Sequence, residues 1–173
     1  MKFIPVILLF GINIAAFSQC NIIENVTDQS GAIKKISTQS IIAEEKYGNS
    51  DYLTFTSNSG FFSLKVHKVF NYVFNAMVDE SDLVVLNFVN DSMIKLYPMY
   101  MTNSKTEEDM RGVTISILDV VYDMTREQLE LLAKVPLASF KMYTHSGIKD
   151  FDVDEFYRKG IMQQAKCILD NIQ

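Results

Sequence analysis

Apolar and polar residues alternate with a period of two through much of the chain, which is the pattern of half-buried β-strands. Residues 51–57 place Leu53 and Phe55 on one face and threonines on the other. Residues 34–45 and 61–74 have a similar strand-like character, and short turn-forming sequences separate the three segments. This part of the chain is therefore predicted to form antiparallel strands joined by turns.

The clearest hairpin combines residues 83–89 with residues 92–97, which flank a turn-forming Asn-Asp pair. The β-branched run at 113–122 predicts a strand in the middle of a sheet. Residues 21–32 are polar and turn-prone, and residues 103–112 are highly charged. The first of these segments predicts no regular structure, and the second predicts a mobile loop.

The hydrophobic period changes to that of a helix in two places. Thr125 and Gln128 form a capping-box pattern at the start of residues 125–135, which predicts a short helix. Residues 155–171 repeat apolar residues at helical spacing, and Asp154 is suited to cap that helix. The chain thus contains one inserted helix and one C-terminal helix.

A second hairpin lies between the two predicted helices, with residues 137–144 and 148–153 as its strands. The strands then number about eight, and they are expected to form a mainly antiparallel, curved sheet. The C-terminal helix is expected to pack on this sheet. The predicted fold class is α+β.

The first residues have the three parts of a secretory signal peptide. Lys2 precedes a short apolar run, and Ala16 and Ser18 are the small residues that a cleavage site requires. The run is too short to span a bilayer comfortably. Residues 1–18 are therefore predicted to be a signal peptide and residues 19–173 a single α+β domain. The expected location is the periplasm, the cell surface or the extracellular medium.

Composition narrows the range of partners. The chain is 48% hydrophobic and 21% charged, which is ordinary for a globular protein. Without the signal peptide it would carry 15 basic and 21 acidic residues, a net charge of −6. There is no basic stripe, so no nucleic-acid partner is expected. No second apolar run reaches the length of a transmembrane span, so no such span is expected.

Cys20 and Cys167 are the two cysteines of the chain, and an oxidising compartment favours a disulfide between them. Cys167 lies off the apolar stripe of the C-terminal helix, on a second face that includes Gly160, where another backbone could approach closely. We expect residues 20–30 to lie along that face. Two free thiols or a lipidated Cys20 are the alternatives, and Gln19 immediately before the cysteine disfavours the lipid anchor.

Few residues offer catalytic chemistry. The two histidines are His67, in a predicted strand, and His145, in a predicted hairpin turn. There is no nucleophile elbow, no paired-cysteine motif and no glycine-rich phosphate loop, so no catalytic residue and no cofactor is predicted. A hydrolase-like enzyme with a site near His145 and Asp150, joined by Tyr143, is the alternative.

Acidic residues alternate near the C-terminal helix as they do in calcium-binding loops. They are Asp150, Asp152 and Asp154. The EF-hand loop also requires glycine at position six and glutamate at position twelve, and these positions hold Glu155 and Ile161. No metal site is therefore predicted, and the aspartates are interpreted as the solvent face of a strand.

One apolar segment stands out as a candidate ligand or partner surface. Tyr97, Met99, Tyr100 and Met101 follow the end of a predicted strand and lead into the charged residues 103–112. They could pack in the core of a curved sheet. The functional interpretation is an exposed patch that binds a protein, a peptide or an apolar ligand.

Segments from most of the chain resemble a family of small exported proteins of Gram-negative bacteria with no known activity. The resemblance is carried by SDLVVLNFVNDSMIKLYP, by VVYDMTREQLELLAKVPLASFKMYTHSG and by the closing FDVDEF and ILDNI. Lys141 and Met142 depart from the family's pattern. The resemblance implies export and this fold, and it implies no reaction. The resulting prediction is a non-enzymatic binding or structural domain of the cell envelope, with an accessory subunit of an envelope assembly as an alternative.

Overall fold

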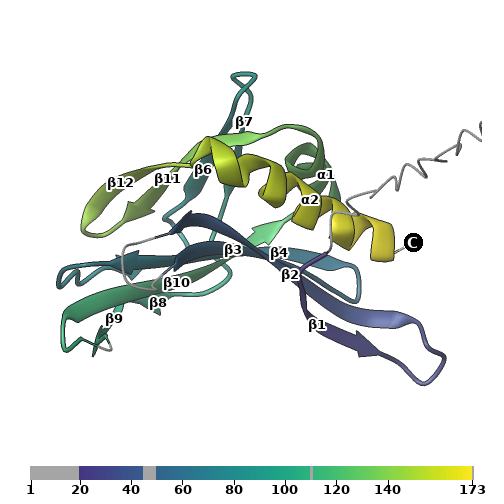
Figure 1. Cartoon of the computed structure of the whole chain (residues 1–173), viewed down its shortest axis with the longest axis horizontal. Coiled ribbons are helices and arrows are strands. Elements are labelled where there is room, and N and C mark those ends of the chain that lie inside the picture. Colours follow the sequence, from purple (N-terminus) through teal and green to yellow (C-terminus); the bar gives the residue numbers. More distant parts are fainter. Residues whose placement is uncertain (1–19, 45–49, 110, 173) are drawn as a thin grey trace, which may run out of the picture.

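The computed structural model describes residues 20–44, 50–109 and 111–172 (Figure 1). The predicted signal peptide, residues 1–18, lies outside the described residues. The described chain forms a mainly antiparallel α+β fold with two helices, as predicted. It contains twelve strands rather than about eight. The difference comes from short strands, several of them in segments whose sequence did not predict a strand.

The largest layer is a six-stranded antiparallel sheet, strongly curled, with the order β1-β2-β3-β4-β10-β9. Its strands are β1 (Ile22–Thr27), β2 (Ile33–Glu44), β3 (Ser50–Asn58), β4 (Phe61–Phe70), β9 (Lys105–Glu108) and β10 (Thr114–Met124). Leu53, Val66 and Val120 occupy neighbouring register positions across the central strands, and all three are fully buried. These apolar residues define the inner face of the sheet.

A second, four-stranded sheet has the order β12-β11-β6-β7. Its strands are β6 (Val84–Phe88), β7 (Met93–Leu96), β11 (Leu137–Thr144) and β12 (Gly147–Asp152). Both hairpins predicted from the sequence are therefore present. A two-stranded sheet pairs β5 (Met77–Val78) with β8 (Thr102–Asn103). Its residue pairs follow the same register as those of the β6–β7 hairpin, although the residues between the two pairs of strands are not paired with each other.

The two helices begin where their capping residues predict. In α1 (Arg126–Lys134) the Thr125 side chain accepts from the Gln128 N–H, and the Gln128 side chain accepts from the Thr125 N–H. In α2 (Glu155–Asn171) the Asp154 carboxylate accepts from the Phe156 N–H. Figure 1 shows α2 lying along the six-stranded sheet and beside α1 and the four-stranded sheet. The prediction that the C-terminal helix packs on a sheet is confirmed.

The second face of α2 is covered by a neighbouring strand, and the disulfide lies at this face. Cys20 and Cys167 are bonded, with 5.8 Å between their Cα atoms. A Cβ atom on Gly160 would lie 3.3 Å from the Ser40 hydroxyl, which explains the small residue there. The strand against this face is mainly β2, whose Thr38 hydroxyl donates to the Gln164 carbonyl over 3.0 Å. Of the predicted residues 20–30, Cys20 is bonded to Cys167 there and the Asn21 N–H donates to the Gln164 side chain.

Two of the segments that the sequence left without strands contain them. Residues 21–32 include β1, which pairs with β2, and residues 103–112 include β9, which pairs with β10. The β-branched residues Ile22, Ile23, Val26 and Thr27 do favour a strand in β1, but polar, turn-forming residues follow them directly. In the charged β9, pairing with the long neighbour β10 outweighs a weak strand propensity. All four residues of β9 are exposed, and three are charged, as is usual for an edge strand. Neither described helix is both long and apolar enough to cross a membrane.

Candidate functional site

A groove of about 420 Å³ crosses the six-stranded sheet, and we call it the outer groove. Five strands contribute to it, namely β1, β2, β3, β4 and β10, together with Met99 from the segment after β7. Its lining consists of Ile23, Glu24, Lys35, Ser37, Thr54, Thr56, Asn58, Phe61, Phe62, Ser63, Lys65, Met99 and Val121. Most of these residues alternate with the buried residues of the inner face, so the groove lies on the opposite side of the sheet from α2.

Large apolar side chains line the outer groove without being buried in it. Phe61 is 77% exposed, Ile23 is 52% exposed and Met99 is 50% exposed. They come from three separate parts of the chain, so that only the folded sheet brings them to one groove. Exposed apolar side chains that are scattered singly over a surface are common, whereas exposed apolar side chains gathered in one groove indicate an interaction site.

The floor of the outer groove is made of hydroxyl groups. The Ser37 and Thr56 hydroxyls lie 2.9 Å apart and share a hydrogen bond. Thr54 is buried, and its hydroxyl has no hydrogen-bond partner among the described residues. A groove with apolar walls and a hydroxyl floor suits a ligand that has both apolar and hydrogen-bonding groups.

Charged side chains around the outer groove are paired. Lys35 contacts Glu24 at 2.8 Å, and the hydrogen bond from Lys35 lowers the pKa of Glu24. Farther along the same face, the His67 ring nitrogen Nδ1 lies 2.9 Å from Asp119, and the His67 ring stacks on Tyr52. The hydrogen bond from His67 lowers the pKa of Asp119. These pairs leave the groove with little net charge.

The predicted surface Tyr97, Met99, Tyr100 and Met101 is exposed, each side chain by between 50% and 60%. The backbone beside it is anchored to β10, because the Met99 N–H donates to the Val121 carbonyl and the Asp123 N–H donates to the Tyr97 carbonyl. Of the four residues, only Met99 lines the outer groove. Phe61 and Ile23 are the neighbours that the sequence did not assign to this surface.

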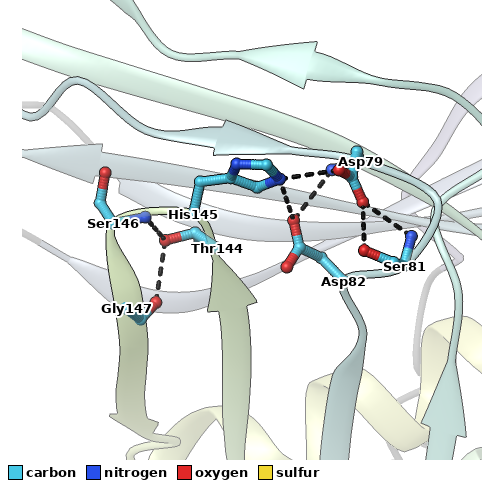
Figure 2. A network of polar contacts seen from close by, with 7 residues as sticks. All are labelled: Asp79, Ser81, Asp82, Thr144, His145, Ser146 and Gly147. Carbon is cyan, nitrogen blue, oxygen red and sulfur yellow. Dashed lines mark hydrogen bonds and ion pairs between the residues drawn. The ribbon is translucent and has the colours of Figure 1, made fainter.

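A second candidate site is a polar cluster of Asp79, Asp82 and His145 (Figure 2). Asp79 follows β5, Asp82 precedes β6, and His145 lies in the turn between β11 and β12. The His145 nitrogen Nε2 lies 2.7 Å from Asp79 Oδ2 and 3.9 Å from Asp82 Oδ2. The fold thus brings an imidazole to two carboxylates that are more than sixty positions away in the chain.

A tight turn holds the two carboxylates in place. The Ser81 N–H and hydroxyl both donate to Asp79 Oδ1, and the Asp79 N–H donates to Asp82 Oδ2. The hydrogen bonds from Ser81, followed by the one from His145, hold the pKa of Asp79 far below its usual range. Asp79 therefore stays ionised, and its Oδ2 atom faces the imidazole.

The other residues of the predicted enzyme alternative are not joined to His145 by any described side-chain contact. Asp150 forms an exposed ion pair with Lys141 at 3.2 Å, and Tyr143 contributes a backbone N–H to the Leu83 carbonyl. Figure 2 shows the Ser146 hydroxyl pointing away from the imidazole, and it donates to the Asn75 carbonyl. The arrangement is therefore not a serine–histidine pair.

The sequence contained only weak signals for these two sites. Asp79-Glu80-Ser81-Asp82 reads as a turn, and nothing in its spacing indicates that a histidine from a distant hairpin contacts it. Phe61 follows a turn glycine at the start of a strand, where a core role is the usual one.

Comparison of the chain with protein-family models, with curated proteins and with solved structures found no match.

Proposed function

We propose that this chain is an exported binding domain of the bacterial cell envelope that holds an extended apolar segment of a partner peptide or protein in the outer groove. The Cys20–Cys167 disulfide supports export, because disulfides persist in oxidising compartments. The predicted signal peptide and the resemblance to small exported proteins support the same location, in the periplasm, at the cell surface or outside the cell. No reaction is assigned to the chain.

The observation that carries this proposal is the exposure of Phe61 in the same groove as Met99 and Ile23. A phenylalanine left 77% exposed gains no stability from burial in this fold. A partner that covered the ring would gain about 1.5–3 kcal/mol from its burial. Binding of an apolar group in the outer groove is thus favoured.

The chemistry of the groove suits an extended peptide as its occupant. Five adjacent strands border it, and strands about 4.8 Å apart give a length of roughly 19 Å. An extended chain of about six residues covers that distance at about 3.3 Å per residue. Its side chains would contact Phe61 and Met99, and its backbone could hydrogen-bond the hydroxyl of Thr56.

The accessory-subunit alternative rests on a different feature, the free edge of β1. Among the described strands β1 pairs only with β2, so its other edge is unpaired, and its side chains Ile22 and Val26 are exposed. An added strand from a partner would pair there. Two register irregularities in β1 oppose such pairing, since bulges protect edge strands. The outer groove is therefore the better-supported surface.

The test is a selection of random seven-residue peptides on the immobilised, oxidised protein, followed by titration of the selected peptides in solution. Phe61→Ser is expected to weaken binding by about tenfold or more, because 1.4 kcal/mol of lost burial corresponds to tenfold in affinity. The matched control is Phe156→Ser. The Phe156 ring lies on α2, is 82% exposed and lines a different groove. The control is expected to bind like the unmodified protein.

Two results would contradict the proposal. One is a selection that yields no peptide whose binding is measurable. The other is a set of peptides bound equally well by the Phe61→Ser and Phe156→Ser proteins, because the groove would then make no contact with them. Circular dichroism of both variants establishes that neither substitution alters the fold.

A further inference from the structure

The Asp79, Asp82 and His145 cluster has the geometry of a small cation site. One donor atom from each residue lies within 4.8 Å of the other two. Zinc binds nitrogen and oxygen ligands at about 2.0–2.2 Å, so donors around one ion lie roughly 3–4 Å apart. The 3.9 Å between His145 and Asp82 already falls in this range. The 2.7 Å between His145 and Asp79 requires these two side chains to separate slightly around an ion.

The way the turn holds the carboxylates leaves donor atoms for an ion. Ser81 occupies Asp79 Oδ1 with two hydrogen bonds, while Asp79 Oδ2 faces His145 (Figure 2). His145 is held by its backbone, since its N–H donates to the Met77 carbonyl over 2.9 Å. The three donors thus come from a fixed turn and a hairpin that is anchored beside it.

Two buried hydroxyls without a described partner belong to strands β8 and β10. Tyr122 is fully buried, and its hydroxyl has no hydrogen-bond partner among the described residues. Burial raises the pKa of this hydroxyl, with a smaller rise from the charge of Asp82. The Thr102 hydroxyl is likewise buried without a described partner, and Thr102 pairs with Val78, the residue before Asp79.

Such hydroxyls are unusual in a folded protein, because a buried polar group without a partner costs about 1–3 kcal/mol. Both oxygens are inaccessible to solvent, so the case for a bound ion stands on the three donor atoms of the cluster.

The donor set selects the kind of cation. Calcium and magnesium sites in proteins use oxygen ligands, whereas imidazole together with carboxylates suits zinc and related transition metals. Three protein ligands leave at least one coordination position for water or another group. The side chains of His145 and Asp79 are 46% and 33% exposed, so that position is open to solvent.

We propose that Asp79, Asp82 and His145 form a zinc-binding site with one open coordination position. None of the three residues lines the outer groove, so the site is separate from the proposed peptide-binding surface. Sequence spacing alone predicted no metal site, because the three ligands meet only in the folded chain.

The experiment is calorimetric titration of ZnCl₂ into the oxidised protein, prepared without a polyhistidine tag and stripped of metal with a chelator. One zinc ion per chain is expected to bind. Loss of a residue that only hydrogen-bonds a metal ligand weakens metal binding roughly 10–100-fold. His145→Ala removes a ligand itself and is expected to weaken zinc binding by more than that. His67→Ala is the matched control, since His67 is the other histidine of the chain and contacts Asp119 instead.

A spectroscopic measurement identifies the ligand directly. With two histidines in the chain, the imidazole signals in a nuclear magnetic resonance spectrum can be assigned by the same two variants. Zinc is expected to shift the His145 signals and to leave those of His67 in place. The proposal is overturned if the unmodified protein binds no zinc, if His145→Ala binds zinc as well as His67→Ala does, or if calcium binds more tightly than zinc.

Discussion

Polar side chains on the six-stranded sheet are held in place by contacts with one another. Asp119 of β10 faces His67 of β4 directly across the strand pair, and Lys65 lies 3.5 Å from the same carboxylate. The imidazole stacks on Tyr52 at a ring distance of 4.1 Å. These contacts fix the side chains in position, and they make the stability of the sheet depend on the ionisation of Asp119.

A pH-dependence follows from that ionisation. The hydrogen bond from His67, with a smaller effect from Lys65, lowers the pKa of Asp119 below 3.8, its ordinary value. The carboxylate therefore contributes its full stabilisation above pH 3.8 and loses it as the pH falls through the lower folded-state pKa. As the pH falls from about 5 to about 2, the Asp119→Asn protein is expected to lose less unfolding free energy than the unmodified protein.

Urea unfolding at a series of pH values measures this effect. Asp150→Asn is the control, because it removes the same charge from an exposed position of β12. The expectation fails if the Asp119→Asn and unmodified proteins lose unfolding free energy in parallel as the medium is acidified. No such difference is expected above pH 5, where Asp119 is ionised in both the folded and the unfolded chain.

At the scale of elements, local capping and tertiary contacts act together. The short helix α1 begins with reciprocal hydrogen bonds between Thr125 and Gln128 and buries Leu129 and Leu132 against the core. A helix of nine residues is too short to be stable alone, so its cap and its packing must both contribute. The sequence pattern located this start because a capping box is a purely local signal.

Removal of the cap should have a measurable cost. Thr125→Ala deletes the acceptor for the Gln128 N–H and is expected to lower the unfolding free energy by about 1 kcal/mol. Thr125→Ser retains the hydroxyl and is the matched control. Chemical denaturation of the two variants measures the difference, and equal stability would show that the hydroxyl contributes nothing to the helix start.

At the scale of the whole molecule, α2 joins parts that the chain order keeps far apart. It packs against β2, β3, β11 and α1, and so contacts both larger sheets. The Cys20–Cys167 disulfide adds a covalent link over 147 positions, from the start of β1 to the last turns of α2. Thr38 and Asn21 hydrogen-bond Gln164 beside it, so the link reinforces contacts that the fold already makes.

Loss of this link should destabilise the whole domain. In the chain-entropy view, a cross-link that closes so long a loop restricts the unfolded state and contributes about 3–5 kcal/mol. The double variant Cys20→Ser with Cys167→Ser is therefore expected to unfold at markedly lower guanidinium concentration than the oxidised protein. Adding reductant should lower the midpoint of the unmodified protein and leave that of the variant unchanged. An unmodified protein that is indifferent to reductant would contradict this expectation.

The sequence by itself determined the features whose causes are local. Alternation of apolar residues predicted most of the longer strands, the two capping patterns located both helix starts, and the cysteine pair was predicted from its count and compartment. A cluster of aromatic and methionine residues suggested that Met99 belongs either to the core or to an exposed surface, and Met99 is 50% exposed. Each of these features depends on residues close in sequence or on simple chemistry.

Tertiary structure alone decided which distant residues meet. Strand β9 forms because the long neighbour β10 offers it hydrogen bonds, although its own charged sequence predicts no strand. Phe61 and Ile23 share the outer groove with Met99 only because the sheet places their strands together. His145 meets Asp79 and Asp82 because β11 pairs with β6 and the His145 N–H donates to the Met77 carbonyl of β5, and no spacing in the chain encodes that encounter.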